Sequence, residues 1–473
     1  MTIRRPELPI AAALGLLLLV VAGRYGYHRD ELYFLEAGYH LAWGYPDQPP
    51  LVPAIARLAS EIAPDSLVVL RVPSLLIAMA VVVLAGVMAR RLGAGTGGQA
   101  LAATSTALCG FVLGMGHLLS TATLDLLGWT LLTYLFLRLL QGDDHRLWLV
   151  AGLVAGLTMQ ANVLVAFLLA GFAIAVLIVG PRRLLASPWL WIGAGIAALF
   201  AVPYLLWQAD HSWPQLDIAS NISSGGSGSS ASRPAFLPLL VLQAGPWLLP
   251  VWLLGLVRLW RDVALRCLAA TFGVLLVVFL IAGGKPYYLA GLFPLLFAAG
   301  AQPLLDWVHR RWVIPALLIL STPAILFALP VLPVRDANPV VNINYDIGET
   351  VGWPQHVQTI ADAYHQLPPG TAILAGNYGE AGAIDRYGPD LGLPRAYSGH
   401  NGFAYWGRPP DSTPVLTLGI DPKLLADVCA RTYKVGRLGQ PFGIDNDEDG
   451  MNLRYCVPRT TWSALWPRFV TLG

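Results

Sequence analysis

Long apolar runs recur through the first 330 residues of this chain, and they constrain its fold more than any other feature. Each run holds roughly 15 to 23 apolar residues, and short charged or polar segments separate the runs. An α-helix needs about 20 mainly apolar residues to cross the hydrocarbon core of a bilayer. The chain is also 56% hydrophobic and only 12% charged, which is about half the charged fraction of an ordinary soluble domain. The sequence therefore predicts an α-helical, polytopic membrane protein.

The apolar runs predict about eleven transmembrane helices. They cover residues 8–23, 67–89, 99–118, 124–140, 147–161, 163–180, 188–207, 235–257, 264–282, 287–304 and 312–330. Basic pairs such as Arg90-Arg91 and Arg182-Arg183 fall in alternate short loops, which the positive-inside rule assigns to the cytoplasm. The N-terminus is then cytoplasmic and the C-terminal region lies outside. A cleaved signal peptide competes for the first run, but the further spans already commit the chain to the membrane.

Two domains follow from the distribution of these runs. Residues 1–330 form a transmembrane domain with a long outer loop at 24–66, and residues 331–473 form a small extracytoplasmic domain. The tail has the pattern of an α/β domain, with buried strands at 372–375 and 414–418 and helical periodicity at 353–366 and 422–433. Basic residues are scattered and form no stripe, which argues against a nucleic-acid partner.

The cysteines and one low-complexity segment leave alternatives open. Cys429 and Cys456 lie in the tail and could form a disulfide if that region is extracytoplasmic, or remain two unpaired buried thiols. The other two cysteines, Cys109 and Cys267, lie in apolar spans. Residues 221–232 are rich in Gly and Ser, which is typical of a flexible linker and also fits a flap over an outer cavity.

A charged loop follows the first span, and membrane orientation does not explain it. It reads HRDELY at residues 28–33, and GYPDQPP follows at residues 44–50. Asp30 and Glu31 would lie near the outer interface, where a carboxylate can accept a proton from a hydroxyl group as a general base. A helix-capping or solvated acidic pair is the alternative. Asp47 is a second acid, presented on a turn that prolines make rigid.

Two more ionisable residues lie at the outer ends of spans, where such groups are functional candidates. Asp125 begins the fourth span, and an ordinary N-cap is an equal alternative. Lys285 lies in the segment GGKPYY, where its ammonium, the Tyr288 hydroxyl and glycine N–H groups could hold a lipid phosphate. Snorkelling of the lysine to the interface is the alternative there.

These pieces together resemble the polyprenyl-phosphate-sugar-dependent glycosyltransferases of GT-C fold, which include protein O-mannosyltransferases and the aminoarabinose transferase of lipid A. The resemblance covers roughly residues 20–330 and rests on Asp30-Glu31, the GYPDQPP segment, Asp125 and the KPYY segment. It implies that Asp30 is the catalytic base, with Glu31 beside it. It also implies that Asp47 and Asp125 belong to the same outer cavity and that Lys285 lies near the donor phosphate.

The sequence departs from that family at two positions. Relatives often have a lysine or arginine just after the loop acids, where this chain has Tyr33 and Gln48. Phosphate binding is therefore expected to rely more on Lys285, His28 or Arg29. The sugar cannot be inferred by analogy.

The mechanism implied is an inverting single displacement at the outer face of the plasma (inner) membrane. An acceptor hydroxyl attacks the anomeric carbon of a polyprenyl-phosphate-linked sugar, and polyprenyl phosphate leaves. The acceptor is a glycan, a lipid or a protein, and membrane lipids surround the enzyme. No cofactor is required, although a divalent metal ion could bridge Asp47 and Asp125 to the phosphate.

Three segments of the tail also carry candidate residues or motifs. The segment GNYGEAGAID at 376–385 fails the dinucleotide fingerprint and fits a tight strand-to-helix turn, although Glu380 could help to bind an acceptor. The segment YSGHNGFAYWG at 397–407 offers His400 and Trp406 for contact with a sugar, and packing in the domain core explains it equally well. Residues 445–450 begin like a calcium loop, but its twelfth position is Cys456, which favours a solvated acidic turn.

Two other functional classes compete with the enzyme. A transporter or flippase would place acids inside the spans and show internal repeats, and the sequence shows neither. A membrane scaffold without catalytic activity predicts that Asp30→Asn leaves activity intact.

Overall fold

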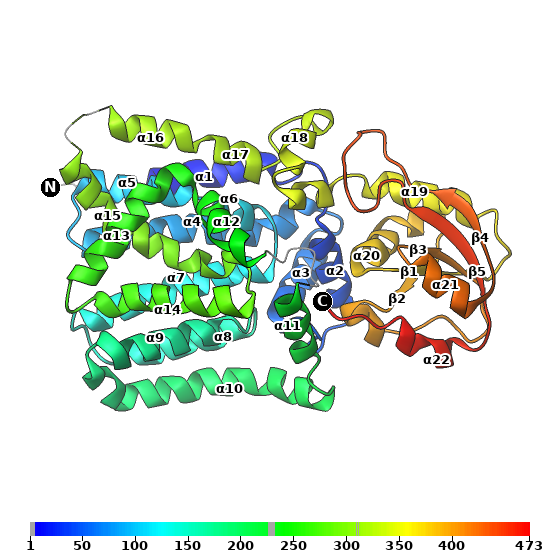
Figure 1. Ribbon diagram of the computed structural model, residues 1–473, viewed down its shortest axis with the longest axis horizontal. Coiled ribbons are helices and arrows are strands. Elements are labelled where there is room, and N and C mark those ends of the chain that lie inside the picture. Colours follow the sequence, from blue (N-terminus) through cyan, green and yellow to red (C-terminus); the bar gives the residue numbers. More distant parts are fainter. Residues whose placement is uncertain (1–4, 226–231, 309, 311) are drawn as a thin grey trace.

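The computed structural model describes residues 5–225, 232–308, 310 and 312–473. A bundle of apolar helices makes up one end of the molecule, and a small mixed sheet covered by helices makes up the other (Figure 1). The predicted fold class, a helical membrane protein with a small C-terminal α/β domain, is confirmed in this coarse form. The glycine- and serine-rich segment, for which a flexible linker and a flap are the alternatives, falls largely at 226–231, outside the described residues.

Four helices in the described part of the chain are long and apolar enough to cross a membrane. They are α4 (Leu67–Arg91), α7 (Thr121–Leu140), α10 (Pro188–Asp210) and the continuous pair η3 (Pro286–Leu292) with α15 (Phe293–Trp307). Five shorter apolar segments lie among them, namely α1 (Glu7–Val21), α8 (Leu147–Met159), α9 (Val165–Val179), α14 (Arg266–Ala282) and α16 (Val313–Ser321) with α17 (Pro323–Ala328). The count of about eleven spans therefore stays a prediction.

Two further spans are possible where a pair of helices is bent. The first pair is α5 (Thr96–Ala107) with α6 (Gly110–His117), bent by 57°, and the second is α12 (Arg233–Ala244) with η2 (Pro246–Leu248) and α13 (Leu249–Arg261), bent by 82°. The two bends contact each other: Gly110 begins α6, and a Cβ added to it would lie 2.6 Å from the carbonyl oxygen of Gln243 near the end of α12. Gly245 has a φ of +98°, in the left-handed region that favours glycine.

A layer of short helices separates the bundle from the α/β domain (Figure 1). It contains α2 (Arg29–Tyr39), α3 (Leu51–Ile62) and α11 (Pro214–Ser224). The apolar side chains of α2 and α3, such as Leu32 and Val52, share one hydrophobic core with Ile373 and Ile384 of the α/β domain. The first outer loop is therefore buried between the two ends of the molecule.

The sheet has five strands in the order β2-β1-β3-β5-β4. The strands are β1 (Ala372–Ala375), β2 (Ala396–Ser398), β3 (Val415–Leu418), β4 (Cys429–Arg437) and β5 (Asn452–Pro458). β1 pairs with β2 and β3 in parallel, whereas β5 pairs with β3 and β4 antiparallel. The helices of this domain are α19 (Trp353–Tyr364), α20 (Tyr378–Tyr387), α21 (Pro422–Val428) and α22 (Trp462–Leu465).

The strands and helices predicted for this domain were correct where a short stretch of sequence shows the pattern. The strands predicted at 372–375 and 414–418 are β1 and β3, and the helix predicted at 353–366 is α19. The helix predicted at 422–433 is wrong beyond Val428, because the chain turns there into β4, which pairs with the distant β5. A disulfide joins Cys429 and Cys456 across these strands, and Cys109 and Cys267 are free and buried.

A connector at residues 331–352 links the bundle to the sheet. It contains η4 (Val334–Asp336), α18 (Asn338–Val341) and η5 (Tyr345–Thr350). Arg24, just after α1, donates to the carbonyl oxygens of Val331 and Leu332 at 2.8 and 3.0 Å. This places the connector beside the beginning of the first outer loop.

Candidate active site

A cavity of about 610 Å³ lies where the bundle, the connector and the α/β domain meet. Its polar lining comes from segments far apart in the sequence and includes His28, Asp30, His117, Ser120, Lys285, Tyr287, Asn344, Asp346 and Tyr378. The remaining lining is largely apolar and comes from α6, the bend between α12 and α13, α16 and α17. Below, the part of the lining that carries the charged residues is called the polar end, and the part that the bundle helices supply is called the apolar arm.

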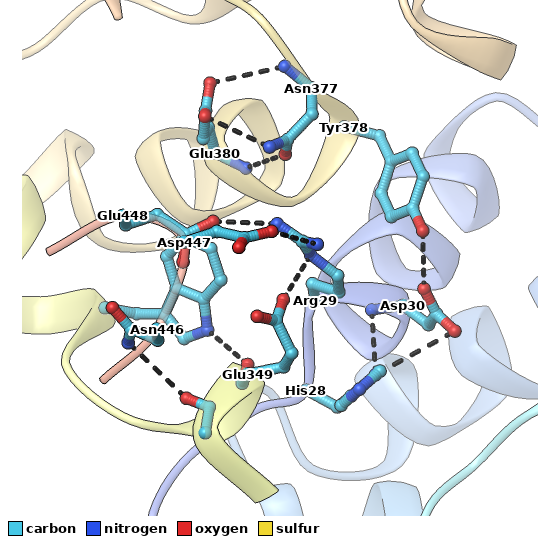
Figure 2. Close-up of polar contacts among 12 residues, drawn as sticks. His28, Arg29, Asp30, Glu349, Asn377, Tyr378, Glu380, Asn446, Asp447 and Glu448 are labelled. Carbon is cyan, nitrogen blue, oxygen red and sulfur yellow. Dashed lines mark hydrogen bonds and ion pairs between the residues drawn. The ribbon is translucent and has the colours of Figure 1, made fainter. Parts of the chain in front are cut away.

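The N-terminus of α2 holds Asp30 at the polar end. His28 is the N-cap, and its Nδ1 accepts the backbone N–H of Asp30 at 3.2 Å. Asp30 then lies in the first helical turn, where the helix dipole favours a negative charge. Its side chain is 39% exposed, and its Oδ1 accepts a hydrogen bond from the Tyr378 hydroxyl at 2.8 Å (Figure 2). The predicted base therefore lines the cavity.

Glu31 has a different environment, which contradicts its predicted catalytic role. The side chain is fully buried, and Arg71 of α4 donates to both carboxylate oxygens at 2.9 and 2.7 Å. The backbone N–H groups of His28 and Leu119 also donate to Glu31, at 2.9 and 3.2 Å. Because both oxygens already have donors and Glu31 does not line the cavity, it fixes the start of α2 to the bundle.

Arg29 points away from the cavity, which contradicts its predicted role as a phosphate ligand. It lies between acids of the connector and of the loop before β5, with Glu349 at 2.6 Å, Glu448 at 2.8 Å and Asp447 at 3.5 Å (Figure 2). Burial raises the pKa of Glu349 and of Glu448 to about 7, against the opposing charge of Arg29. Arg29 therefore attaches α2 to the C-terminal region.

Asp47 lies near the cavity but does not line it. Its Oδ1 accepts a hydrogen bond from the Tyr33 hydroxyl at 2.7 Å. Burial, together with a smaller effect of the Asp30 charge, raises the pKa of Asp47 to about 7 against the hydrogen bond from Tyr33. Tyr33 thus makes a neutral contact with Asp47 at a position where relatives of the predicted family often carry a cation.

Asp125 lies one turn inside α7 and faces a second, much smaller cavity with Asn162 and Tyr288. Ser120 is the N-cap of α7, since its Oγ accepts the N–H of Thr123 at 3.2 Å, so the capping alternative for Asp125 is wrong. Asp125 and Tyr288 line this second cavity and not the main one, and Tyr287 lines both. Within the described ranges, no group of three or more His, Cys, Asp or Glu side chains is arranged to hold a metal ion.

Lys285 lines the main cavity together with Asp30 and His28. It follows α14 and immediately precedes η3, and its Nζ lies 5.9 Å from the ring centroid of Tyr287. Burial lowers the pKa of the Lys285 amine, while the charges of Asp30 and Asp346 oppose this shift. The predicted cation is therefore present at the polar end, with Tyr287 rather than Tyr288 beside it.

The three predicted acceptor-binding residues of the tail do not line the cavity. Glu380 is buried and caps α20, accepting the N–H groups of Gly376 and Asn377 at 2.9 and 3.2 Å, so the strand-to-helix turn is the correct interpretation. The Trp406 ring packs against Tyr33, with centroids 5.9 Å apart, and stacks on His40 at 4.7 Å. The His400 ring lies 4.8 Å from that of Tyr378.

Sequence reasoning missed several residues that the fold brings to the polar end. Tyr378 lies in the GNYGEAG segment, of which the sequence analysis names Glu380 as the candidate. Asn344 and Asp346 come from the connector, and His117 ends α6 with its Nε2 3.1 Å from a nitrogen of Arg71. The one local signal for Tyr378 is its position as an aromatic residue within a glycine-rich turn. No local signal marks Asn344, Asp346 or His117.

Comparisons with known proteins agree with this architecture. A family model described as dolichyl-phosphate-mannose-protein mannosyltransferase matches residues 47–207. The crystal structure of ArnT from Cupriavidus metallidurans in the apo state superposes with a TM-score of 0.61 at 14% identity, covering 94% of this chain and 97% of that chain. The chain has the fold of ArnT.

A second ArnT structure from the same organism, bound to undecaprenyl phosphate, gives a TM-score of 0.55 at 14% identity with the same coverage. No curated protein sequence matches the chain. The predicted resemblance is thus supported at the level of fold: the chain is similar in fold to ArnT, and residues 47–207 match the mannosyltransferase family model. The ArnT-like fold accounts for both the helical bundle and the C-terminal α/β domain, because the alignment spans nearly the whole of both chains.

Proposed function

We propose that this protein is an inverting glycosyltransferase that moves a sugar from a polyprenyl-phosphate donor to an acceptor hydroxyl. The observation that carries the proposal is the placement of Asp30 and Lys285 in one cavity whose remaining lining is largely apolar. A lipid-phosphate sugar presents the matching chemistry, namely a long apolar chain, an anionic phosphate and a reactive anomeric carbon. The undecaprenyl phosphate bound to ArnT supports a ligand of this class.

In the proposed reaction, an acceptor hydroxyl attacks the anomeric carbon while its proton passes to Asp30. A new C–O bond forms between acceptor and sugar, and the bond between the anomeric carbon and the phosphate oxygen breaks. The electron pair leaves with polyprenyl phosphate, so the sugar configuration inverts. A phosphate needs no general acid to depart, and the nearby charge of Lys285 stabilises the negative charge that develops on it.

His28 is a second candidate for the phosphate site. Its Nδ1 accepts from the backbone of Asp30, and its buried Nε2 has no protein partner. In this tautomer Nε2 carries the hydrogen and can donate to an anion in the cavity. The proposed donor site thus contains Lys285 and His28 and omits Arg29 and Tyr288. The roles of Asp47 and Asp125, and a divalent metal bridging them, find no support in their separate surroundings.

The apolar arm of the cavity is proposed to hold the first isoprene units of the donor. It is lined by side chains such as Phe111, Leu242, Trp247 and Phe327. Burying apolar surface is worth about 25 cal/mol per Å², so this arm favours a lipid-linked sugar over a free sugar phosphate. The proposed sugar is a hexose or a pentose, and the proposed acceptor is a glycan, a lipid or a protein.

The proposed location is the plasma (inner) membrane, with the cavity and the α/β domain outside the cytoplasm. The alternation of basic loops favours this orientation. The Cys429–Cys456 disulfide supports it as well, because disulfides persist mainly in oxidising compartments outside the cytoplasm.

The test incubates the purified protein with radiolabelled polyprenyl-phosphate sugars and membrane extracts. We expect transfer by the wild type and a loss of roughly 1,000-fold in Asp30→Asn, within the range for a general base. Glu61→Gln is the matched control, since Glu61 is an exposed acid on α3 that pairs with Arg57, and it should keep full activity. Absence of transfer and of donor hydrolysis by the wild type with all common donors would refute the enzyme. Unchanged transfer by Asp30→Asn would refute Asp30 as the base.

A further inference from the structure

The hydroxyl of Tyr378 connects the C-terminal domain to Asp30 through an observed hydrogen bond. Tyr378 is the first residue of α20, and it donates to Asp30 Oδ1 at 2.8 Å across 348 positions of sequence (Figure 2). Both residues line the same cavity. The contact therefore joins the α/β domain directly to the proposed catalytic base.

The Tyr378 ring is held in place by its neighbours. Its centroid lies 4.9 Å from that of Tyr33 and 4.8 Å from that of His400, with both rings tilted against it. The capping box of Asn377 and Glu380 fixes the first turn of α20 from which the ring projects. The hydroxyl position thus follows from packing and does not depend on Asp30 alone.

The glycines of the GNYGEAG segment set the distance between α20 and α2. A Cβ on Gly379 would lie 2.7 Å from the Cβ of Arg29, and one on Gly382 would lie 3.0 Å from the Cβ of Leu32. Any larger side chain at these positions would push α20 away from α2. The GxxGxxG pattern therefore serves close helix packing, and this packing brings the Tyr378 hydroxyl within reach of Asp30.

We propose that Tyr378 is a positioning residue that orients Asp30 for proton abstraction, so that the α/β domain completes the active site of the transmembrane enzyme. The inference rests on the proposed function. Because Oδ1 is occupied by the phenol, Oδ2 is the atom that takes the acceptor proton. His28 does not compete for Oδ2, since its Nδ1 lies 3.9 Å away and accepts the N–H of Asp30.

Loss of the phenol has two expected effects on the reaction. A hydrogen bond donated to a carboxylate favours its ionised form, so we expect the acidic limb of the rate profile to move to higher pH when the phenol is removed. The carboxylate also loses its fixed orientation, which lowers kcat more than it changes the KM for the donor. A residue that acts only in folding would change neither the pH profile nor the balance between kcat and KM.

The experiment compares Tyr378→Phe with Tyr387→Phe in the purified full-length protein. Tyr378→Phe keeps the ring between Tyr33 and His400 and removes only the hydroxyl. We expect kcat to fall on the order of tenfold, with the acidic limb of the rate profile moved to higher pH. Tyr387 lies at the far end of α20, where its ring packs against Tyr27, so Tyr387→Phe should match the wild type.

A second variant covers the case in which Tyr378→Phe does not fold. Gly379→Ala retains the phenol but forces α20 and α2 apart, and it should move the acidic limb in the same direction. Wild-type pH profiles and kcat in the folded variants would overturn the inference. If the wild type transfers sugar and Asp30→Asn does not, that result leaves the proposed function intact. If the wild type itself transfers none, the proposed function fails.

Discussion

The start of α2 and the acidic loop at residues 445–449 are both rich in charge, and the structure uses them in opposite ways. Asp30 at the start of α2 is 39% exposed in a cavity, and its side chain accepts from a neutral phenol. Glu448 in the loop is 1% exposed and forms an ion pair with Arg29 at 2.8 Å. Charge density therefore does not distinguish a site from a structural contact, whereas access and the kind of partner do.

The same distinction applies to adjacent residues within α2. Asp30 faces the cavity, while Arg29 and Glu31 are engaged in ion pairs with Glu349 and Arg71, respectively. Consecutive helical residues point in directions about 100° apart, so one residue can reach substrate while its neighbours contact two different domains. The charged run thus has one proposed catalytic member and two that fix its position.

The largest expected effect on stability comes from Glu31. In Glu31→Ala the guanidinium of Arg71 stays buried without its carboxylate, which should destabilise the protein by about 3–5 kcal/mol. Asp30→Asn should change stability by no more than about 0.5 kcal/mol. Thermal unfolding in detergent micelles measures both, and the double variant Glu31→Ala/Arg71→Met should recover part of the loss. Equal unfolding midpoints for the two single variants would show that Glu31 contributes no more to stability than Asp30 does.

A smaller effect is expected from Glu448. Glu448→Ala removes one buried acceptor of the Arg29 guanidinium, which should cost about 1.5–3 kcal/mol. The matched control is Asp449→Ala in the same loop, because Asp449 is exposed and should change stability by less than about 0.5 kcal/mol. Limited proteolysis of the connector and the unfolding midpoint both report whether the C-terminal region stays attached to α2. Similar protease sensitivity of the two variants would show that Arg29 does not hold the C-terminal region.

The smallest effect is a pH dependence of the protein's stability that comes from Glu349 and Glu448, the buried acids beside Arg29. Burial raises the pKa of Glu349 and Glu448 from 4.5 to about 7, so the folded state binds protons there more tightly than the unfolded state. This stabilisation is complete below about pH 4.5 and is lost as the pH rises through about 7. The unfolding midpoint should therefore be lower at about pH 8.5 than at about pH 6. Glu448→Gln should show a smaller decrease, and an equal decrease would contradict this origin.

Much of the fold could be predicted because its signals are local. Apolar runs mark the bundle, the short buried runs mark β1 and β3, and Asp30 and Lys285 stand out beside spans. The prediction failed at β4, because its pairing with β5 is invisible in the helical periodicity of 422–433. It also placed Asp125 in the cavity of Asp30, since a position at a span end does not fix the direction of a side chain.

Local patterns were enough to predict the membrane character, the C-terminal α/β domain and a short set of charged candidates, because hydrophobic runs and isolated charges can be recognised within a few residues. The role of each candidate depends on contacts that form only when the chain folds. Glu31 meets Arg71 across 40 positions, Arg29 meets Glu448 across 419, and Tyr378 meets Asp30 across 348. A carboxylate becomes a structural anchor or a base according to its partners and its exposure, and chain folding alone brings those partners together.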